Sequence, residues 1–254
     1  MKKAIVYTLV FAAIELIMPF LIKQTLRIIT GTEPQQDARF LIIIMTASSV
    51  AVLALFLWQR WAVVSRSYVR SKPWGALFWC GLAAIGAVIP SMWLQEQMPE
   101  LPNIVEQEFD MILKDRWGYF AVGLLAPVCE EIVFRGAVLR ALLRWTHHHW
   151  MAIAVSALLF ALIHANPAQM PHAFLIGLLL GWLYYRTDSV VPGVVYHWVN
   201  NSIAYVMYNL YPDPSLKLPD LFGSQRTVAA AVLFSLFILL PALYQLNLRL
   251  KKAR

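Results

Sequence analysis

Long apolar stretches separated by short polar linkers dominate the pattern of this sequence. Eight of them approach the roughly 20 residues that an α-helix needs to cross a bilayer. They lie near residues 4–22, 40–59, 74–93, 118–139, 150–165, 171–186, 190–209 and 227–247. The pattern therefore predicts an all-α protein, folded as a polytopic membrane bundle of about eight transmembrane helices.

Two linkers differ from the rest. The short fifth and sixth stretches are joined by an uncharged turn around Asn166, which can lie within the depth of the membrane if protein or a water-filled cavity surrounds it. The linker 94–116 is acidic and carries apolar residues at helical spacing: Val105, Phe109, Ile112 and Leu113. This spacing favours an amphipathic helix on the membrane surface, with a solvated acidic loop as the alternative.

The composition agrees with a membrane protein. Apolar residues make up 60% of the chain and charged residues 14%, against about 45–50% and about 25% in ordinary soluble domains. One soluble core of this length could not bury so much apolar surface. Because no internal repeat and no soluble segment interrupts the pattern, we interpret residues 1–254 as a single membrane-embedded domain.

The net charge of +7 does not indicate nucleic-acid binding, because the basic residues lie in short linkers rather than along a soluble surface. With both termini inside, thirteen of the 21 Lys and Arg residues would be cytoplasmic and seven would lie opposite. This bias predicts an integral, multi-pass membrane protein with both termini in the cytoplasm. Four of the thirteen are at the C-terminus: Arg249, Lys251, Lys252 and Arg254.

Ionisable side chains inside an apolar stretch are costly, so each of them needs a partner or a purpose. Glu131 and Arg135 are four residues apart in the fourth stretch, so on a helix they share a face and can pair. Glu130 is turned from Glu131 by roughly 100° around the helix axis, which leaves it free to meet a different neighbour. A desolvated carboxylate without a counter-charge binds a proton readily, which suits a general base.

Polar residues on two further stretches complete a candidate site. His164 closes the fifth stretch, and His197 and Asn201 share a helical face in the seventh. Glu130 could take a proton from a water that attacks a carbonyl, and His164 could position that water or protonate the leaving amine. His197 and Asn201 could donate hydrogen bonds to the developing oxyanion. Each group alone has a structural explanation, such as an ion-pair lock or interhelical hydrogen bonding, but their combination favours a site.

Other polar positions are less informative. Glu15, alone in the first stretch, is interpreted as a structural residue or a packing hydrogen bond. The run from His147 to His149 lies in a turn between tryptophans, which favours an interfacial belt over a metal site. A transporter or proton pathway is a further alternative for the intramembrane carboxylates, but no pair of broken helices with matching halves supports it.

These residues form three motifs that resemble the CPBP intramembrane proteases, also known as the CAAX-protease and bacteriocin-processing or Abi family. The motifs are EExxxR at Glu130–Arg135, FxxxH at Phe160–His164 and HxxxN at His197–Asn201. Any one of them is weakly specific, but three in this order, all within apolar stretches, are a strong signal. The resemblance covers about residues 118–205, the expected catalytic core.

The resemblance implies an intramembrane endopeptidase that hydrolyses peptide bonds of membrane-associated proteins or peptides. It also implies about eight helices around a catalytic cavity. At the matching positions Glu130 is similar to the water-activating glutamate. The other catalytic residues implied are His164, His197 and Asn201, and the supporting residues are Glu131, Arg135 and Phe160.

Cofactor and partner expectations follow from the same residues. We expect no cofactor; a zinc ion held by His164, His197 and Glu130 is the alternative, although HExxH is absent and ligation would occupy the expected base. The expected partners are membrane lipid and a membrane-anchored protein or peptide substrate. Because some members of the family act without proteolysis, a membrane scaffold or immunity protein is the alternative function.

Overall fold

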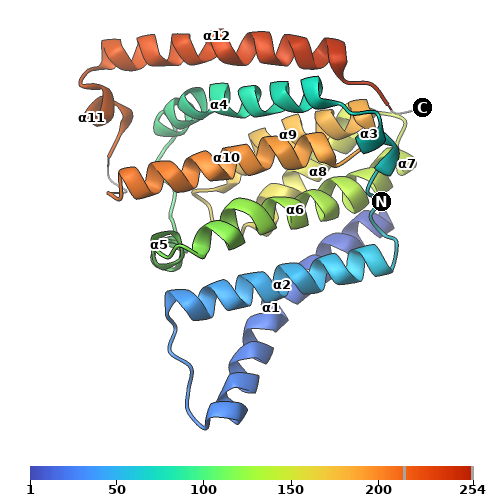
Figure 1. The fold of residues 1–254 in the computed structure, drawn as a ribbon, viewed down its shortest axis with the longest axis vertical. Helices are drawn as coiled ribbons and strands as arrows, with labels where there is room; N and C mark the ends of the chain where they lie inside the picture. The colour runs from blue at the N-terminus through green and yellow to red at the C-terminus, as the bar shows by residue number, and fades with distance from the viewer. Residues whose placement is uncertain (214–215, 253–254) are drawn as a thin grey trace.

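The computed structural model describes residues 1–213 and 216–252 of the chain. These residues form helices joined by turns, with no β-strand among them (Figure 1). The predicted all-α class is therefore confirmed. Arg254, one of the four C-terminal basic residues, lies outside the described residues.

Within the described ranges, eight long helical segments coincide with the eight apolar stretches of the sequence. Four of them are long and apolar enough to cross a bilayer: α1 (Lys2–Thr30), α2 (Ala38–Trp58), α4 (Trp74–Glu96) and α12 (Gln225–Arg249). The other four are a continuous segment from Tyr119 to Trp145, α8 (His149–Ile163), α9 (Met170–Thr187) and α10 (Val191–Leu210). Three short helices connect them: α3 (Arg66–Arg70), α5 (Glu106–Lys114) and α11 (Leu218–Phe222). The protein is thus an integral membrane protein, and about eight crossings remains the prediction.

The segment that carries the two adjacent glutamates is an irregular helix. Its parts follow one another as η1 (Tyr119–Leu125), α6 (Ala126–Glu131), η2 (Ile132–Leu139) and α7 (Arg140–Trp145), of which η1 and η2 are π-helical. Pro127 lacks an N–H, and its ring crowds the preceding turn, which disfavours regular α-helical bonding there. The wider turns leave Glu130 and Glu131 on a short α-helical segment between two π-helical ones, an irregularity frequent at functional sites.

This irregular helix lies near the middle of the bundle. In Figure 1, α1 and α2 lie on one side of α6, and α10, α4 and α12 follow in turn on the other. The half of α1 that precedes α2 diverges from the bundle (Figure 1). The largest apolar core joins α1, α2, η2 and α8, and it includes Phe11, Phe56, Phe134 and Phe160. The arrangement encloses η2 while leaving one side of α12 and α1 free to face lipid.

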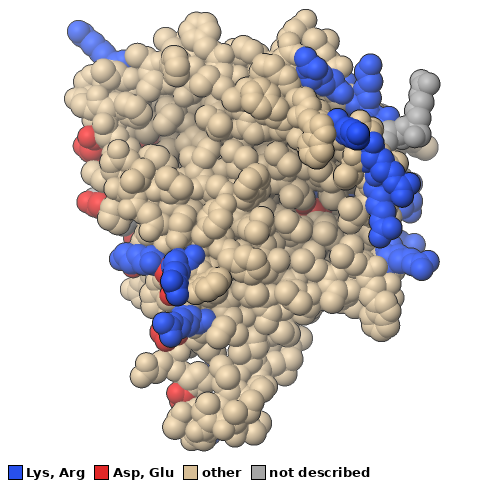
Figure 2. All heavy atoms as spheres, in the orientation of Figure 1, with Lys and Arg blue, Asp and Glu red and all other residues tan. Residues whose placement is uncertain are grey.

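Charged residues separate toward the two ends of the bundle. Most of the visible Lys and Arg side chains gather at the end where the N-terminus, α3 and the last turn of α12 lie (Figures 1 and 2). Most of the visible Asp and Glu side chains lie toward the opposite end (Figure 2). The uneven distribution of Lys and Arg among the linkers of the sequence therefore becomes a separation of charge between the two ends of the folded bundle. The assignment of the basic end to the cytoplasm remains a prediction.

The two unusual linkers pack against each other. Residues 106–114 form α5, as the apolar spacing predicts, and Ile112 is buried. The turn after α8 is enclosed by protein, because Asn166 is fully buried. Its side chain accepts a hydrogen bond from the Ile104 N–H (3.1 Å) and donates one to Asn103 Oδ1 (2.8 Å). Protein groups therefore bond both polar atoms of the Asn166 side chain.

Candidate active site

The best-defined interaction of the site is the ion pair between Glu131 and Arg135. Arg135 Nη1 donates to Glu131 Oε1 at 2.8 Å, and both side chains are almost completely buried. The guanidinium also donates to the Gly177 carbonyl of α9 (3.3 Å) and lies 4.4 Å from the centre of the Phe160 ring. The four-residue spacing thus produces the predicted pair, which joins the segment Tyr119–Trp145 to α8 and α9.

His197 lies between the two adjacent glutamates. Its Nδ1 is 3.2 Å from Glu131 Oε1, and its Nε2 is 3.7 Å from Glu130 Oε2. The Glu131 carboxylate, which pairs with Arg135, can only accept hydrogen bonds, so Nδ1 of His197 carries a hydrogen. Nε2 of the same ring faces Glu130. The Glu131–Arg135 pair therefore orients His197 as well as holding the helices together, a link that spacing alone does not predict.

Gly193, one turn before His197 on α10, makes this approach possible. A Cβ atom at this position would lie 2.5 Å from Glu131 Oε2. Any side chain here would push the carboxylate away from α10 and hence from His197. Gly193 is a supporting residue that sequence reasoning missed. Its position four residues before His197 places both residues on the same helical face, and this spacing was the available signal.

The imidazole of His164 is held by a backbone carbonyl one helical turn earlier. Its Nδ1 lies 2.8 Å from the Phe160 carbonyl, and since a carbonyl only accepts, the hydrogen is on Nδ1 and Nε2 is left free. The Phe160 ring stands edge-to-face to both imidazoles, with ring centres 4.9 Å from His164 and 5.9 Å from His197. The FxxxH motif thus supplies one aromatic ring that contacts both histidines and the Arg135 guanidinium.

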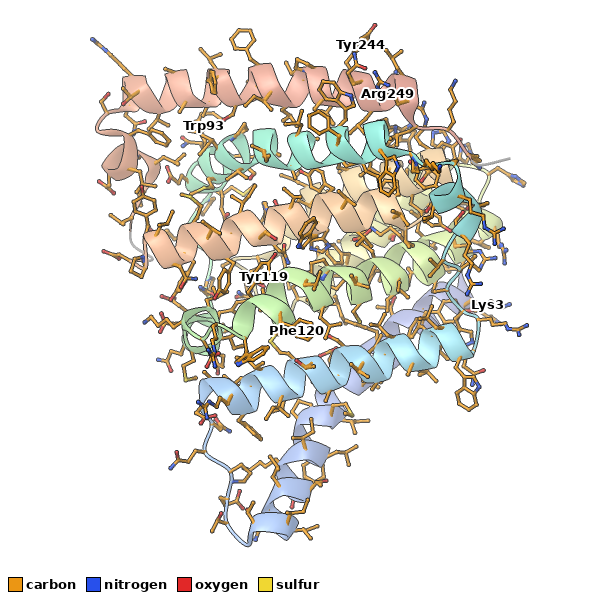
Figure 3. All side chains as sticks on the ribbon, viewed as in Figure 1. Lys3, Trp93, Tyr119, Phe120, Tyr244 and Arg249 are labelled. Atoms are coloured by element: carbon orange, nitrogen blue, oxygen red, sulfur yellow. The ribbon has the colours of Figure 1, made fainter. Side chains whose placement is uncertain are left out.

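Asn201 is held by its own helix and by η1. Its Nδ2 donates to the Val122 carbonyl (3.1 Å), and its Oδ1 accepts from Asn200 (3.3 Å). An amide nitrogen has two hydrogens, so one remains for a substrate. Nearby, Tyr119, the first residue of η1 (labelled in Figure 3), contacts α10, because its hydroxyl accepts a hydrogen bond from Trp198 Nε1 (3.0 Å). These bonds fix α10 against η1.

The motif residues from three different helical segments meet at one cavity of about 400 Å³. Its walls include Glu130, Phe160, His164, His197 and Asn201, while the Glu131–Arg135 pair lies behind them. The volume is within the roughly 300–1,000 Å³ that small-ligand pockets occupy. A larger cavity of 980 Å³ beside α5 shares four lining residues with it: Phe109, Leu113, Gln169 and Tyr208. The site therefore lies next to the acidic linker.

Two further ionisable residues belong to this region. His172, at the start of α9, lines the 400 Å³ cavity, although no motif or four-residue partner in the sequence singles it out. Glu15, which the sequence suggests as structural, lines a separate cavity of about 200 Å³ together with Glu130 and His164. Both placements depend on how distant helices pack, so the only sequence signal was an ionisable residue in an apolar stretch.

The donor set does not resemble a preformed metal site. Within residues 1–213 and 216–252, no group of three or more His, Cys, Asp or Glu side chains is arranged to hold a metal ion. Nδ1 of both His164 and His197 is bonded to protein, which leaves Nε2 of each ring to face the cavity and is compatible with either function, as a metal ligand or as a hydrogen-bonding group. In the histidine run, His149 stacks on Tyr185 with ring centres 4.3 Å apart, and the predicted interfacial belt stays a prediction.

Comparison with known proteins supports the motif assignment. Residues 113–203 match the family described as Rce1-like, Type II CAAX prenyl endopeptidase Rce1-like. The chain is 26% identical over 117 residues to the UPF0177 protein YbdI of Lactococcus lactis subsp. lactis (strain IL1403), which covers 44% of this chain and 62% of that relative. The chain thus spans about three fifths of the length of the curated relative it matches. No solved structure matches the chain. The predicted resemblance to the CAAX-protease (CPBP) family is confirmed for this segment, and it supports a membrane endopeptidase in general.

Proposed function

We propose that this protein, a membrane protein of the CAAX-protease type by the match of residues 113–203, is an intramembrane endopeptidase. The observation that carries the proposal is the position of Glu130 in the wall of a 400 Å³ cavity, 3.7 Å from His197, while Arg135 already neutralises Glu131. Two adjacent carboxylates therefore have different tasks. Glu131 is an anchor, and Glu130 is available for chemistry.

In the proposed mechanism, both ring nitrogens of His197 carry a hydrogen. Two carboxylates then face Arg135 and His197, and Nδ1–H of His197 donates to Glu131 while Nε2–H is directed toward Glu130 and the cavity. A buried charge requires such compensation. In this form His197 can donate a hydrogen bond to an oxyanion in the cavity, and the remaining Nδ2 hydrogen of Asn201 can do the same.

The proposed reaction is hydrolysis of a peptide bond by an activated water. Glu130 takes one proton from the water, and the water oxygen forms a bond to the carbonyl carbon. His197 and Asn201 stabilise the resulting oxyanion. When the C–N bond breaks, the leaving amine receives the proton from Glu130 through His164 Nε2, and the remaining hydroxyl becomes part of the new carboxyl group. Glu130 ends as it began, as a carboxylate.

The substrate proposed is a protein or peptide held at the membrane. The catalytic residues lie within apolar helices, so a soluble chain would have to leave water to reach them. A lipid-modified C-terminal peptide, the kind of substrate in the description of the matched family, is the first candidate to test. The proposed reaction uses no cofactor. Cleavage is measured with and without a chelator, and activity that is lost with the chelator and restored by zinc would assign Glu130, His164 and His197 as ligands.

The test is the substitution Glu130→Gln, which keeps the size of the side chain and removes the base. Membranes that carry the wild-type protein or the variant are compared by proteomics, with the expectation that some peptides are cleaved only by the wild type. A fluorescence or thermal assay must first show that the variant inserts and folds. Equal cleavage would refute the assignment, and an intact cellular function without cleavage would favour a scaffold or immunity protein.

A further inference from the structure

Glu15 and Glu130 lie on the same small cavity, on the side of Glu130 that faces α1 and α2. This cavity, of about 200 Å³, also contains Ser49, Cys129 and His164 in its walls. Glu130 and His164 line the 400 Å³ cavity as well. They therefore separate a larger cavity, with room for substrate, from a smaller one, which the proposed mechanism has so far not used.

Glu15 has no bonding partner that would explain it as a structural residue. A carboxyl group within a membrane span is costly and is normally paired. Yet Glu15 forms no hydrogen bond or salt bridge with any other residue in the described ranges, and it is only partly buried. Its carboxyl group therefore needs a partner of another kind, and the cavity that it lines has space for one.

We propose that the small cavity stores the water consumed in hydrolysis, and that Glu15 is the positioning residue that keeps it hydrated. This inference rests on the proposed function. A buried water needs roughly 2–4 polar partners and about 30 Å³ of volume. The cavity meets both needs, since it offers two carboxyl groups, an imidazole and the Ser49 hydroxyl. Without Glu15, its α1 side would consist of apolar groups such as Phe11.

The experiment compares Glu15→Gln with Glu15→Leu, which are similar in size but differ in their ability to bind water. Replacement by Leu should displace water from the α1 side of the cavity and lower kcat by at least about tenfold, within the roughly 100-fold or more that a general base contributes. The KM should not change, because substrate occupies the other cavity. The Gln variant should stay close to the wild-type kcat, since an amide also donates and accepts.

The two cysteines of the chain give a direct measurement of the water. Both are buried, but Cys129 lines the small cavity while Cys80 lies in the apolar cluster of α4, α9, α10 and α12. Hydroxyl radicals generated from bound water by X-ray pulses should oxidise Cys129 and leave Cys80 unmodified. Oxidation of Cys129 should fall in Glu15→Leu and stay at the wild-type level in Glu15→Gln.

The outcomes separate this inference from the proposed function. The inference is overturned if Glu15→Leu keeps the wild-type kcat, or if oxidation of Cys129 does not depend on residue 15. Labelling is repeated in Glu130→Gln, in which it should persist because the cavity remains polar. If the wild-type protein cleaves no peptide, the proposed function and the use of this water fail together. If the wild type cleaves, Glu130→Gln does not, and both Glu15 variants keep the wild-type kcat, the proposed function stands and the water store does not.

Discussion

The outer helices and the helices around Glu130 place the same kinds of residue in opposite environments. On α12 and α1, Phe237 is 77% exposed and Leu16 is 78% exposed, as expected for side chains that face lipid. In η2, every residue from Ile132 to Leu139 is buried, including the charged Arg135. An outer helix thus needs only sufficient length and hydropathy, whereas each polar atom near Glu130 needs a partner. The consequence is that matched substitutions should have very different effects in the two regions.

The largest difference in stability is expected between two arginines. Arg135→Met leaves Glu131 buried without its counter-charge and should reduce the free energy of unfolding by about 3–5 kcal/mol. Arg27→Met breaks a salt bridge with Glu33 (3.1 Å) in which both side chains are more than half exposed, and it should cost about 0–1 kcal/mol. Unfolding curves in detergent measure both values.

The double variant Arg135→Met with Glu131→Gln is the internal control. If the cost of Arg135→Met comes from the uncompensated carboxylate, neutralising Glu131 as well should recover part of the lost stability. Equal losses for Arg135→Met and Arg27→Met would remove the distinction between the inner and outer parts of the bundle.

Two asparagines on α10 extend the comparison to catalysis. Asn201 lines the 400 Å³ cavity, while Asn209 is exposed near the end of α10, where it donates to the carbonyls of Leu113 and Tyr205. Asn201→Ala removes a proposed oxyanion donor and should lower kcat by about 100- to 1000-fold. Asn209→Ala should leave kcat unchanged. Single-turnover cleavage of a peptide substrate measures this, and similar kcat values for the two variants would exclude Asn201 from the oxyanion site.

Much of this contrast could be predicted from the sequence, because local geometry determines it. The lengths of the apolar stretches give the positions of the outer helices. The four-residue spacing between Glu131 and Arg135 gives their ion pair, since i and i+4 share a face of any helix. The interaction holds even though π-helical turns begin directly after Glu131, so this prediction did not require the helix to be regular.

The contacts between distant helices could not be predicted in the same way. That His197 bridges Glu130 and Glu131 depends on how α10 packs against α6, and no periodicity in either stretch records it. The positions of Glu15 and His172 beside the motif residues likewise depend on the packing of α1 and α9. The end of the first apolar stretch at residue 22 also predicted too early an end for the first helix. Lys23 and Arg27 are compatible with helix and continue α1 to Thr30, where Gly31 ends it in the left-handed conformation.

The smallest expected effect compares two glycines, and it tests how closely the inner helices must approach. Gly193→Ala places a Cβ atom 2.5 Å from Glu131 Oε2, so either the carboxylate or α10 must move. Overpacking of this kind costs about 1–3 kcal/mol, and cleavage should fall as well, because Glu131 would no longer orient His197. Gly81→Ala on α4 has Val199 as its nearest neighbour at 3.9 Å. It should be neutral or stabilising by up to about 1 kcal/mol, since Ala favours helix over Gly. If Gly193→Ala keeps both stability and cleavage, Glu131 has room to move, and its hold on His197 is not needed for the reaction.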